Sequence, residues 1–92
     1  MAEYIVKLYP SNQYIEKAYI SLDSARKAAY AAVKKGSCTQ GTIYSFDGWR
    51  EYGAVFVYKG KMVYRREPMP RYHQEYGLWD VYPSGKLGVR RG

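Results

Sequence analysis

The side chains in this 92-residue sequence that could do chemistry are mainly those of tyrosine, arginine and lysine. Twelve tyrosines occur beside fifteen basic and eight acidic residues, and the formal net charge at pH 7 is +7. Guanidinium and ammonium groups bind phosphates and carboxylates, while tyrosine rings stack on planar groups and anchor protein interfaces. The composition therefore favours a surface that contacts a polyanion or a partner protein.

Groups that could catalyse a reaction or bind a metal are few. Cys38 and His73 are the single cysteine and histidine, which is fewer than the three or four ligands of a zinc site. The carboxylates show no paired spacing that would suggest a general acid and a general base. Ser84-Gly85-Lys86 is like the end of a phosphate-binding loop, but no glycine stands at the upstream position that this motif requires. We expect a protein that is not an enzyme and that uses no metal or cofactor.

The lone Cys38 cannot form a disulfide within the chain, which fits a reducing compartment. We expect its thiol to be inert and partly buried. No stretch approaches the roughly 20 apolar residues of a membrane span, and the opening residues MAEYIVKLYP lack the charged and apolar order of a signal peptide. These features predict a cytoplasmic protein without membrane contact.

Basic residues are densest in the last third of the sequence, where arginine predominates. Arginine suits bidentate contacts with phosphate or carboxylate, and neighbouring tyrosines could stack on bases or pack against a partner. The candidate binding residues are Tyr58, Lys61, Tyr64, Arg65, Arg66, Arg71, Tyr72, Tyr82, Lys86, Arg90 and Arg91.

The elements that must position these residues can be predicted from local patterns. Residues 22–35 have the pattern of an α-helix, which Ser21 can cap and Gly36 can end. The apolar stripe that would pack against a sheet contains Leu22, Ala25, Ala29 and Val33. The residues predicted to point mostly outward are Arg26, Lys27, Tyr30, Lys34 and Lys35.

Strands are predicted on both sides of this helix, at residues 4–9, 14–20, 42–46, 54–58 and 61–65. The last two form a hairpin with a tight loop at Lys59-Gly60, which pairs Val57 with Met62 and Phe56 with Val63. Because these successive apolar pairs face opposite ways, the hairpin is expected in the middle of the sheet, covered on both sides.

A C-terminal hairpin is predicted around the turn Tyr82-Pro83-Ser84-Gly85. Its register pairs Val81 with Leu87 and Trp79 with Val89, which places Trp79 in the core. Residues 67–77, between the two hairpins, contain two prolines and form a long loop, where binding residues such as Arg71 and Tyr72 often lie.

The sequence therefore predicts a single α+β domain over residues 1–92, with a basic tail at residues 90–92. One helix packs on a mostly antiparallel sheet of about five to six strands, in a chain order of two strands, the helix and then five strands. The opposite face of the sheet is partly open, and an edge strand could pair with a second copy to form a homodimer.

Two functions from different classes fit this surface. The first is a binding protein that contacts nucleic acid or another polyanion through arginine, lysine and tyrosine. The alternative is a protein interaction module or inhibitor that docks on an acidic surface of a larger partner, such as an accessory or anti-defence protein of a phage or other mobile element. A minor alternative is a small metal-independent ribonuclease that would use arginine, tyrosine and histidine.

Overall fold

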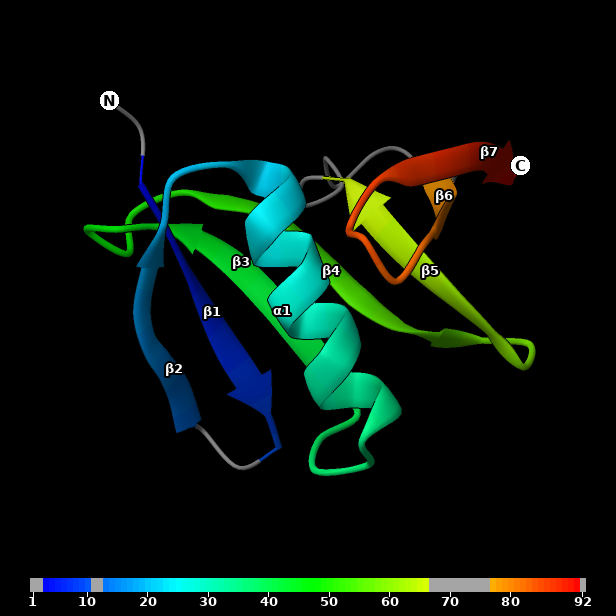
Figure 1. The fold of residues 1–92 in the computed structure, drawn as a ribbon, viewed down its shortest axis with the longest axis horizontal. Helices are drawn as coiled ribbons and strands as arrows, with labels where there is room; N and C mark the ends of the chain where they lie inside the picture. The colour runs from blue at the N-terminus through cyan, green and yellow to red at the C-terminus, as the bar shows by residue number, and fades with distance from the viewer. Residues whose placement is uncertain (1–2, 11–12, 67–76, 92) are drawn as a thin grey trace, which may run out of the picture.

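A computed structural model describes residues 3–10, 13–66 and 77–91 of the chain. Its elements are β1 (Tyr4–Tyr9), β2 (Gln13–Tyr19), α1 (Leu22–Lys34), β3 (Gln40–Ser45), β4 (Glu51–Tyr58), β5 (Lys61–Arg66), β6 (Leu78–Val81) and β7 (Leu87–Arg91). The strands form one antiparallel sheet in the order β2-β1-β3-β4-β5-β6-β7, and α1 lies across one of its faces (Figure 1). The predicted α+β class and the predicted order of elements along the chain are confirmed, but the count of five to six strands is too low, because all seven strands join one sheet.

The helix begins and ends as its sequence predicts. The side chain of Ser21 accepts a hydrogen bond of 3.1 Å from the backbone amide of Ser24, and Gly36 follows the helix with a left-handed φ of 84°. Ala25 and Ala29 are fully buried against the sheet. The prediction that Arg26 points outward is wrong, because only 8% of this residue is exposed.

Helix and sheet approach each other closely at β3. A Cβ atom built on Gly41 would lie 2.7 Å from the Cβ of Ala29, so a larger residue at either position would push the two elements apart. Around this contact Val6, Ile43 and Val55 are fully buried. These residues form the core on the α1 side of the sheet.

Cys38 belongs to the same core, as predicted for a buried thiol. Burial raises the pKa of this thiol, which keeps it in the less reactive protonated form.

The central hairpin has the predicted register, in which Val57 pairs with Met62 and Phe56 pairs with Val63. Lys59 and Gly60 both have left-handed backbones, with φ values of 51° and 78°, as a two-residue hairpin turn requires. The expected cover on both faces is incomplete, because Val57 is 54% exposed.

The C-terminal hairpin departs from its predicted register at one point. Val81 pairs with Leu87 as expected, but Trp79 pairs with Arg90 rather than with Val89. The difference arises because the register shifts between the two pairs, as at a β-bulge. The shift places an arginine opposite a tryptophan.

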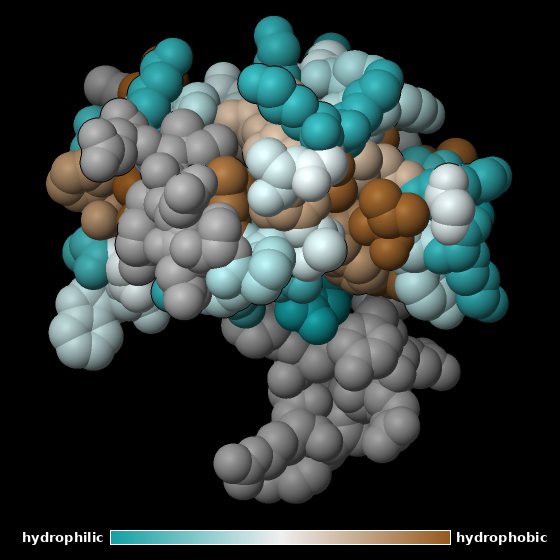
Figure 2. All heavy atoms as spheres, turned by 90° about the horizontal axis from the view of Figure 1, so that it is seen from below, coloured by the Kyte–Doolittle hydropathy of each residue, from teal (hydrophilic) through white to brown (hydrophobic). Residues whose placement is uncertain are grey.

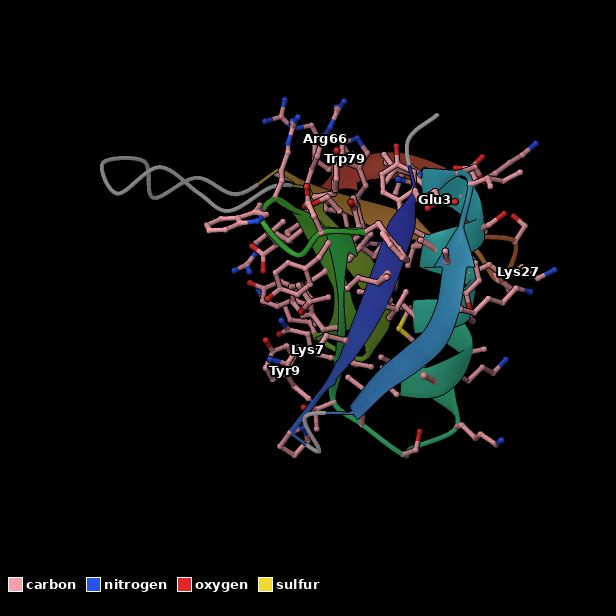
Figure 3. All side chains as sticks on the ribbon, turned by 90° about the vertical axis from the view of Figure 1, so that its left-hand side faces the viewer. Glu3, Lys7, Tyr9, Lys27, Arg66 and Trp79 are labelled. Carbon is pink, nitrogen blue, oxygen red and sulfur yellow. The ribbon has the colours of Figure 1, made fainter. Side chains whose placement is uncertain are left out.

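The face of the sheet opposite α1 carries polar and aromatic side chains, among them Lys7 and Tyr9 (Figure 3). The hydroxyl groups of Tyr9 and Tyr44 are 3.2 Å apart on this face. Exposed apolar residues also occur among hydrophilic ones on the side of the molecule that lies at the bottom of Figure 1, as Figure 2 shows. Within the described ranges there is no helix with the length and apolar character that crossing a bilayer requires.

Candidate arginine and aromatic binding site

The predicted binding residues do not gather on one surface. Tyr58 and Lys61 face each other at the exposed end of the β4–β5 hairpin. Tyr82 and Lys86 are exposed beside the turn between β6 and β7. Arg71 and Tyr72, with the rest of the predicted loop up to residue 76, lie outside the described residues.

Tyr64, Arg65 and Arg91 also differ from the prediction of a shared surface. Tyr64 is only 1% exposed, and its hydroxyl donates a hydrogen bond of 3.0 Å to the backbone carbonyl of Tyr52. Its ring is therefore part of the core and cannot bind a partner. Arg65 and Arg91 lie on the face of the sheet opposite α1, where Arg91 forms an ion pair with Asp80.

Two of the predicted arginines do come together, on the α1 side of the sheet. The guanidinium carbons of Arg66 and Arg90 lie 5.6 Å and 5.5 Å from the centre of the Trp79 ring. Arg66 and Trp79 are labelled in Figure 3. Trp79 is only half-buried, so it is not simply a core residue. Contact with the face of a tryptophan ring orients an arginine while leaving its N–H groups available to an anion.

Arg66, one of this pair of arginines, also lines a cavity of about 360 Å³. Its walls come from the start of α1, from the turn between β3 and β4, from β4 and β5, and from β7. The lining residues are Leu22, Arg26, Arg50, Tyr52, Tyr64, Arg66 and Leu87. Three arginines from separate segments of the chain therefore meet around one cavity.

Arg26 is the buried arginine of this cavity, and its contacts are structural. Its Nε donates a hydrogen bond of 2.8 Å to the carbonyl of Gly85, and its guanidinium group forms an ion pair with Asp23. The guanidinium carbon also lies 5.0 Å from the centre of the Tyr64 ring. These contacts join α1 to the β6–β7 turn and fix one positively charged wall of the cavity.

The turn between β3 and β4 presents an exposed tryptophan next to Arg50. Trp49 is 89% exposed, although hydrogen bonds fix the backbone of the turn that carries it. The carboxylate of Asp47 accepts hydrogen bonds from the Ser45 hydroxyl and, at 3.0 Å, from the Trp49 amide. The amide of Ser45 donates at 2.7 Å to the carbonyl of Arg50.

Arg50 continues the pattern of stacked arginines. Its guanidinium carbon lies 4.7 Å from the centre of the Tyr52 ring. We call the set of Trp49, Arg50, Tyr52, Arg66, Trp79 and Arg90 the arginine site. It offers three exposed guanidinium groups and one freely accessible indole ring, which together can bind anions and planar groups.

Four of the six residues of the arginine site are absent from the sequence-based candidates: Trp79, which was predicted as core, and the neighbouring set of Trp49, Arg50 and Tyr52. A signal for this set was present, because the turn residues Asp47-Gly48 directly precede Trp49, and an exposed aromatic beside a tight turn is a common binding feature. The bulge that brings Arg90 to Trp79 gave no comparable signal.

Little in the described residues suggests catalysis. They contain no group of three or more histidine, cysteine or carboxylate residues that could hold a metal ion. The Cys38 thiol is buried, and His73 lies outside the described ranges, so the ribonuclease alternative stays an untested prediction.

The sequence matches no protein-family model, and comparisons with curated proteins and with solved structures give no match.

Proposed function

We propose that this chain is a non-enzymatic nucleic-acid-binding protein that holds a single strand at the arginine site. The observation that carries the proposal is the convergence of arginines around one cavity, one of which, Arg50, directly follows the exposed Trp49 in the chain. Single-stranded nucleic acids are bound by this combination of cations along the backbone and aromatic rings against the bases.

Each part of the site has a role in this proposal. Arg50, Arg66 and Arg90 contact phosphates, and Trp49 stacks on a base. Tyr52 and Trp79 hold the guanidinium groups in place by their ring contacts. Because the arginines are oriented before binding, less side-chain entropy is lost when the nucleic acid arrives.

The salt dependence of binding tests the role of the arginines. Labelled single-stranded DNA and RNA of about 12 nucleotides, and a duplex, would be titrated with the protein from about 50 to 300 mM salt. We expect single strands to bind, with an affinity that falls as salt rises. In the variant R50A/R66A/R90A the slope of log K against log salt should become smaller by about 2, since each lost contact with a single strand contributes about 0.7.

A matched control removes three positive charges elsewhere, in the variant K34A/K35A/K59N. Lys34 and Lys35 are exposed at the end of α1, and asparagine tolerates the left-handed backbone at position 59. We expect the control to keep the salt slope of the wild-type chain. An equal loss of slope in both variants would show that the salt dependence of binding reflects only the net charge of the chain. If the folded wild-type protein binds no nucleic acid, the proposal is excluded.

The variant W49A separates stacking from charge. It should bind single strands about tenfold more weakly, because stacking on an aromatic ring contributes about 1–3 kcal/mol per base. Its salt slope should stay unchanged, because no charge is removed. Full affinity in W49A would remove Trp49 from the proposed site.

A further inference from the structure

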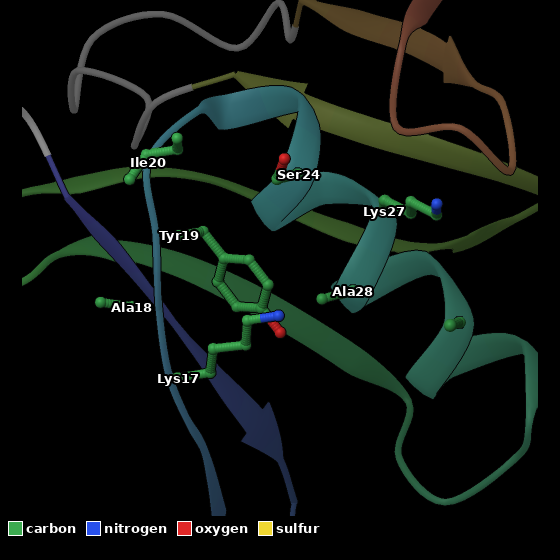
Figure 4. A pocket seen from close by; sticks show the side chains of 8 residues that line it. Lys17, Ala18, Tyr19, Ile20, Ser24, Lys27 and Ala28 are labelled. Atoms are coloured by element: carbon green, nitrogen blue, oxygen red, sulfur yellow. The ribbon is translucent and has the colours of Figure 1, made fainter.

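A second hollow lies on the other side of α1, between the helix and the edge strand β2. It is a groove of about 600 Å³ (Figure 4). The residues that line it are Lys17, Ala18, Tyr19, Ile20, Ser24, Lys27, Ala28 and Ala31. With 3.6 residues per turn, Ser24, Ala28 and Ala31 lie on the opposite side of the helix from Leu22 and Arg26, which line the arginine cavity.

The groove exists because β2 bows away from its neighbour. Val6 pairs with Ile15, whereas Tyr4 pairs with Tyr19, so a two-residue step along β1 corresponds to a four-residue step along β2. The additional residues form a bulge, which bends the strand. Ala28 and Ala31 have small side chains, so the helix does not fill the space that the bend opens.

The outer edge of β2 is available for another strand. β2 lies at the end of the sheet, and β1 is the strand that pairs with it among the described elements. An edge strand exposes backbone N–H and C=O groups, to which an extended peptide can add while its alternate side chains enter neighbouring pockets. An edge and a groove side by side suit this mode of binding.

The groove has an apolar floor and a positively charged rim. Figure 4 shows that Tyr19 and Lys17 point from β2 toward Ala28 on the helix. Ile20, at the upper end of the groove, is 69% exposed. Lys17 and Lys27 are both exposed, and they are the charged side chains that line the groove.

We infer that this groove binds an extended, acidic segment of a partner protein, which adds to the edge of β2. An apolar side chain of the segment packs against Tyr19 and Ala28, and its carboxylates face Lys17 and Lys27. The charge of the groove argues against a second copy of this chain as the occupant, because that copy would bring the same lysines and a net charge of +7. The groove shares no lining residue with the cavity of the arginine site.

A library of linear peptides displayed on phage tests the chemistry of the occupant, with the full chain as the target. We expect the enriched peptides to contain acidic residues that alternate with apolar ones. Synthetic copies of these peptides would then be titrated against groove variants. In K17E/K27E their affinity should fall about tenfold or more, while the control K34E/K35E should bind them with an affinity close to wild type.

A second variant tests the shape of the groove without changing its charge. Ala31 is exposed, and leucine is also a good helix former, so A31L fills the groove while the fold is kept. The selected peptides should bind A31L about tenfold more weakly. A selection without acidic enrichment, or peptides that bind both groove variants as tightly as wild type, would overturn the inference. Self-association of the purified chain that K17E/K27E abolishes would assign the groove to a second copy and overturn it too.

Discussion

Asp47 holds the turn that carries the exposed Trp49. Its carboxylate accepts hydrogen bonds from the Ser45 hydroxyl and the Trp49 amide, and these bonds lower its pKa below the usual value of 3.8. The charged form is favoured because both donors point at the carboxylate. The turn is therefore best held when Asp47 is ionised.

The sign of the pH effect follows from this lowered pKa. A carboxylate with a lower pKa in the folded chain stabilises the fold above its unfolded pKa, and this contribution is lost as the pH falls through the folded pKa. In a titration by NMR, the Trp49 amide resonance should move with a midpoint below 3.8. In the variant D47N this transition should disappear. A midpoint above 3.8 would contradict the hydrogen bonds described for this turn.

Arg26 illustrates which property of a single residue escapes sequence analysis. The helical period places it four residues after Leu22 and three before Ala29, at the edge of the apolar stripe, where a charged side chain normally turns toward solvent. It is buried because the β6–β7 turn, more than fifty residues later, covers that side and supplies the Gly85 carbonyl as an acceptor. No local pattern around Arg26 contains this information.

At the scale of elements, the β6–β7 turn is held against the start of α1 at Gly85. A Cβ atom on this residue would lie 1.9 Å from the backbone carbonyl oxygen of Asp23 and 2.8 Å from the amide nitrogen of Lys27. The residue also has a left-handed backbone, with φ of 88°. Both the backbone angle and the space at this position therefore require glycine.

The variant G85A should separate the turn from the helix. We expect a loss of about 3 kcal/mol or more in the free energy of unfolding, from strain in the backbone and overpacking together. G60A is the matched control, because Gly60 has a φ of 78° but no atom lies within 4 Å of the position that a Cβ would take, and it should lose only about 1–2 kcal/mol. Urea unfolding measures the free energy of unfolding of both variants. Equal losses would show that the contact between Gly85 and α1 contributes little to stability.

The register of a hairpin was predictable where its turn fixes the pairing of the strands. It was not predictable where a bulge lies between the paired residues. The two-residue loop at Lys59-Gly60 sets the pairing of Val57 with Met62, which was predicted correctly from the sequence. The pairing of Trp79 with Arg90 depends on a bulge. Many sequences accommodate a bulge without any residue pattern that would reveal it. Since this pairing brings together two of the six residues of the arginine site, the site was only partly predictable.

At the scale of the whole molecule, α1 separates two candidate binding surfaces. The arginine cavity and the β2 groove use opposite sides of the same helix. Both are basic, as the net charge of +7 would suggest, but they differ in chemistry. Guanidinium groups and rings line the first, whereas the second has an apolar floor between two lysines.

The two surfaces should bind their ligands independently. We expect a selected acidic peptide to bind with an affinity that changes less than about twofold when a single-stranded oligonucleotide saturates the protein. Isothermal titration of the peptide into the free protein and into the complex measures this directly. Displacement of the peptide by the oligonucleotide would mean that both ligands use one surface.

The order of the strands has a consequence for how the chain folds. Each pair of neighbours in the sheet is also consecutive in the chain, except for β1 and β3. Hairpins between consecutive strands close short loops and can form early, whereas joining β1 to β3 must enclose β2, α1 and their connections, about 30 residues. We therefore expect the junction between β1 and β3 to be the last part of the sheet to close.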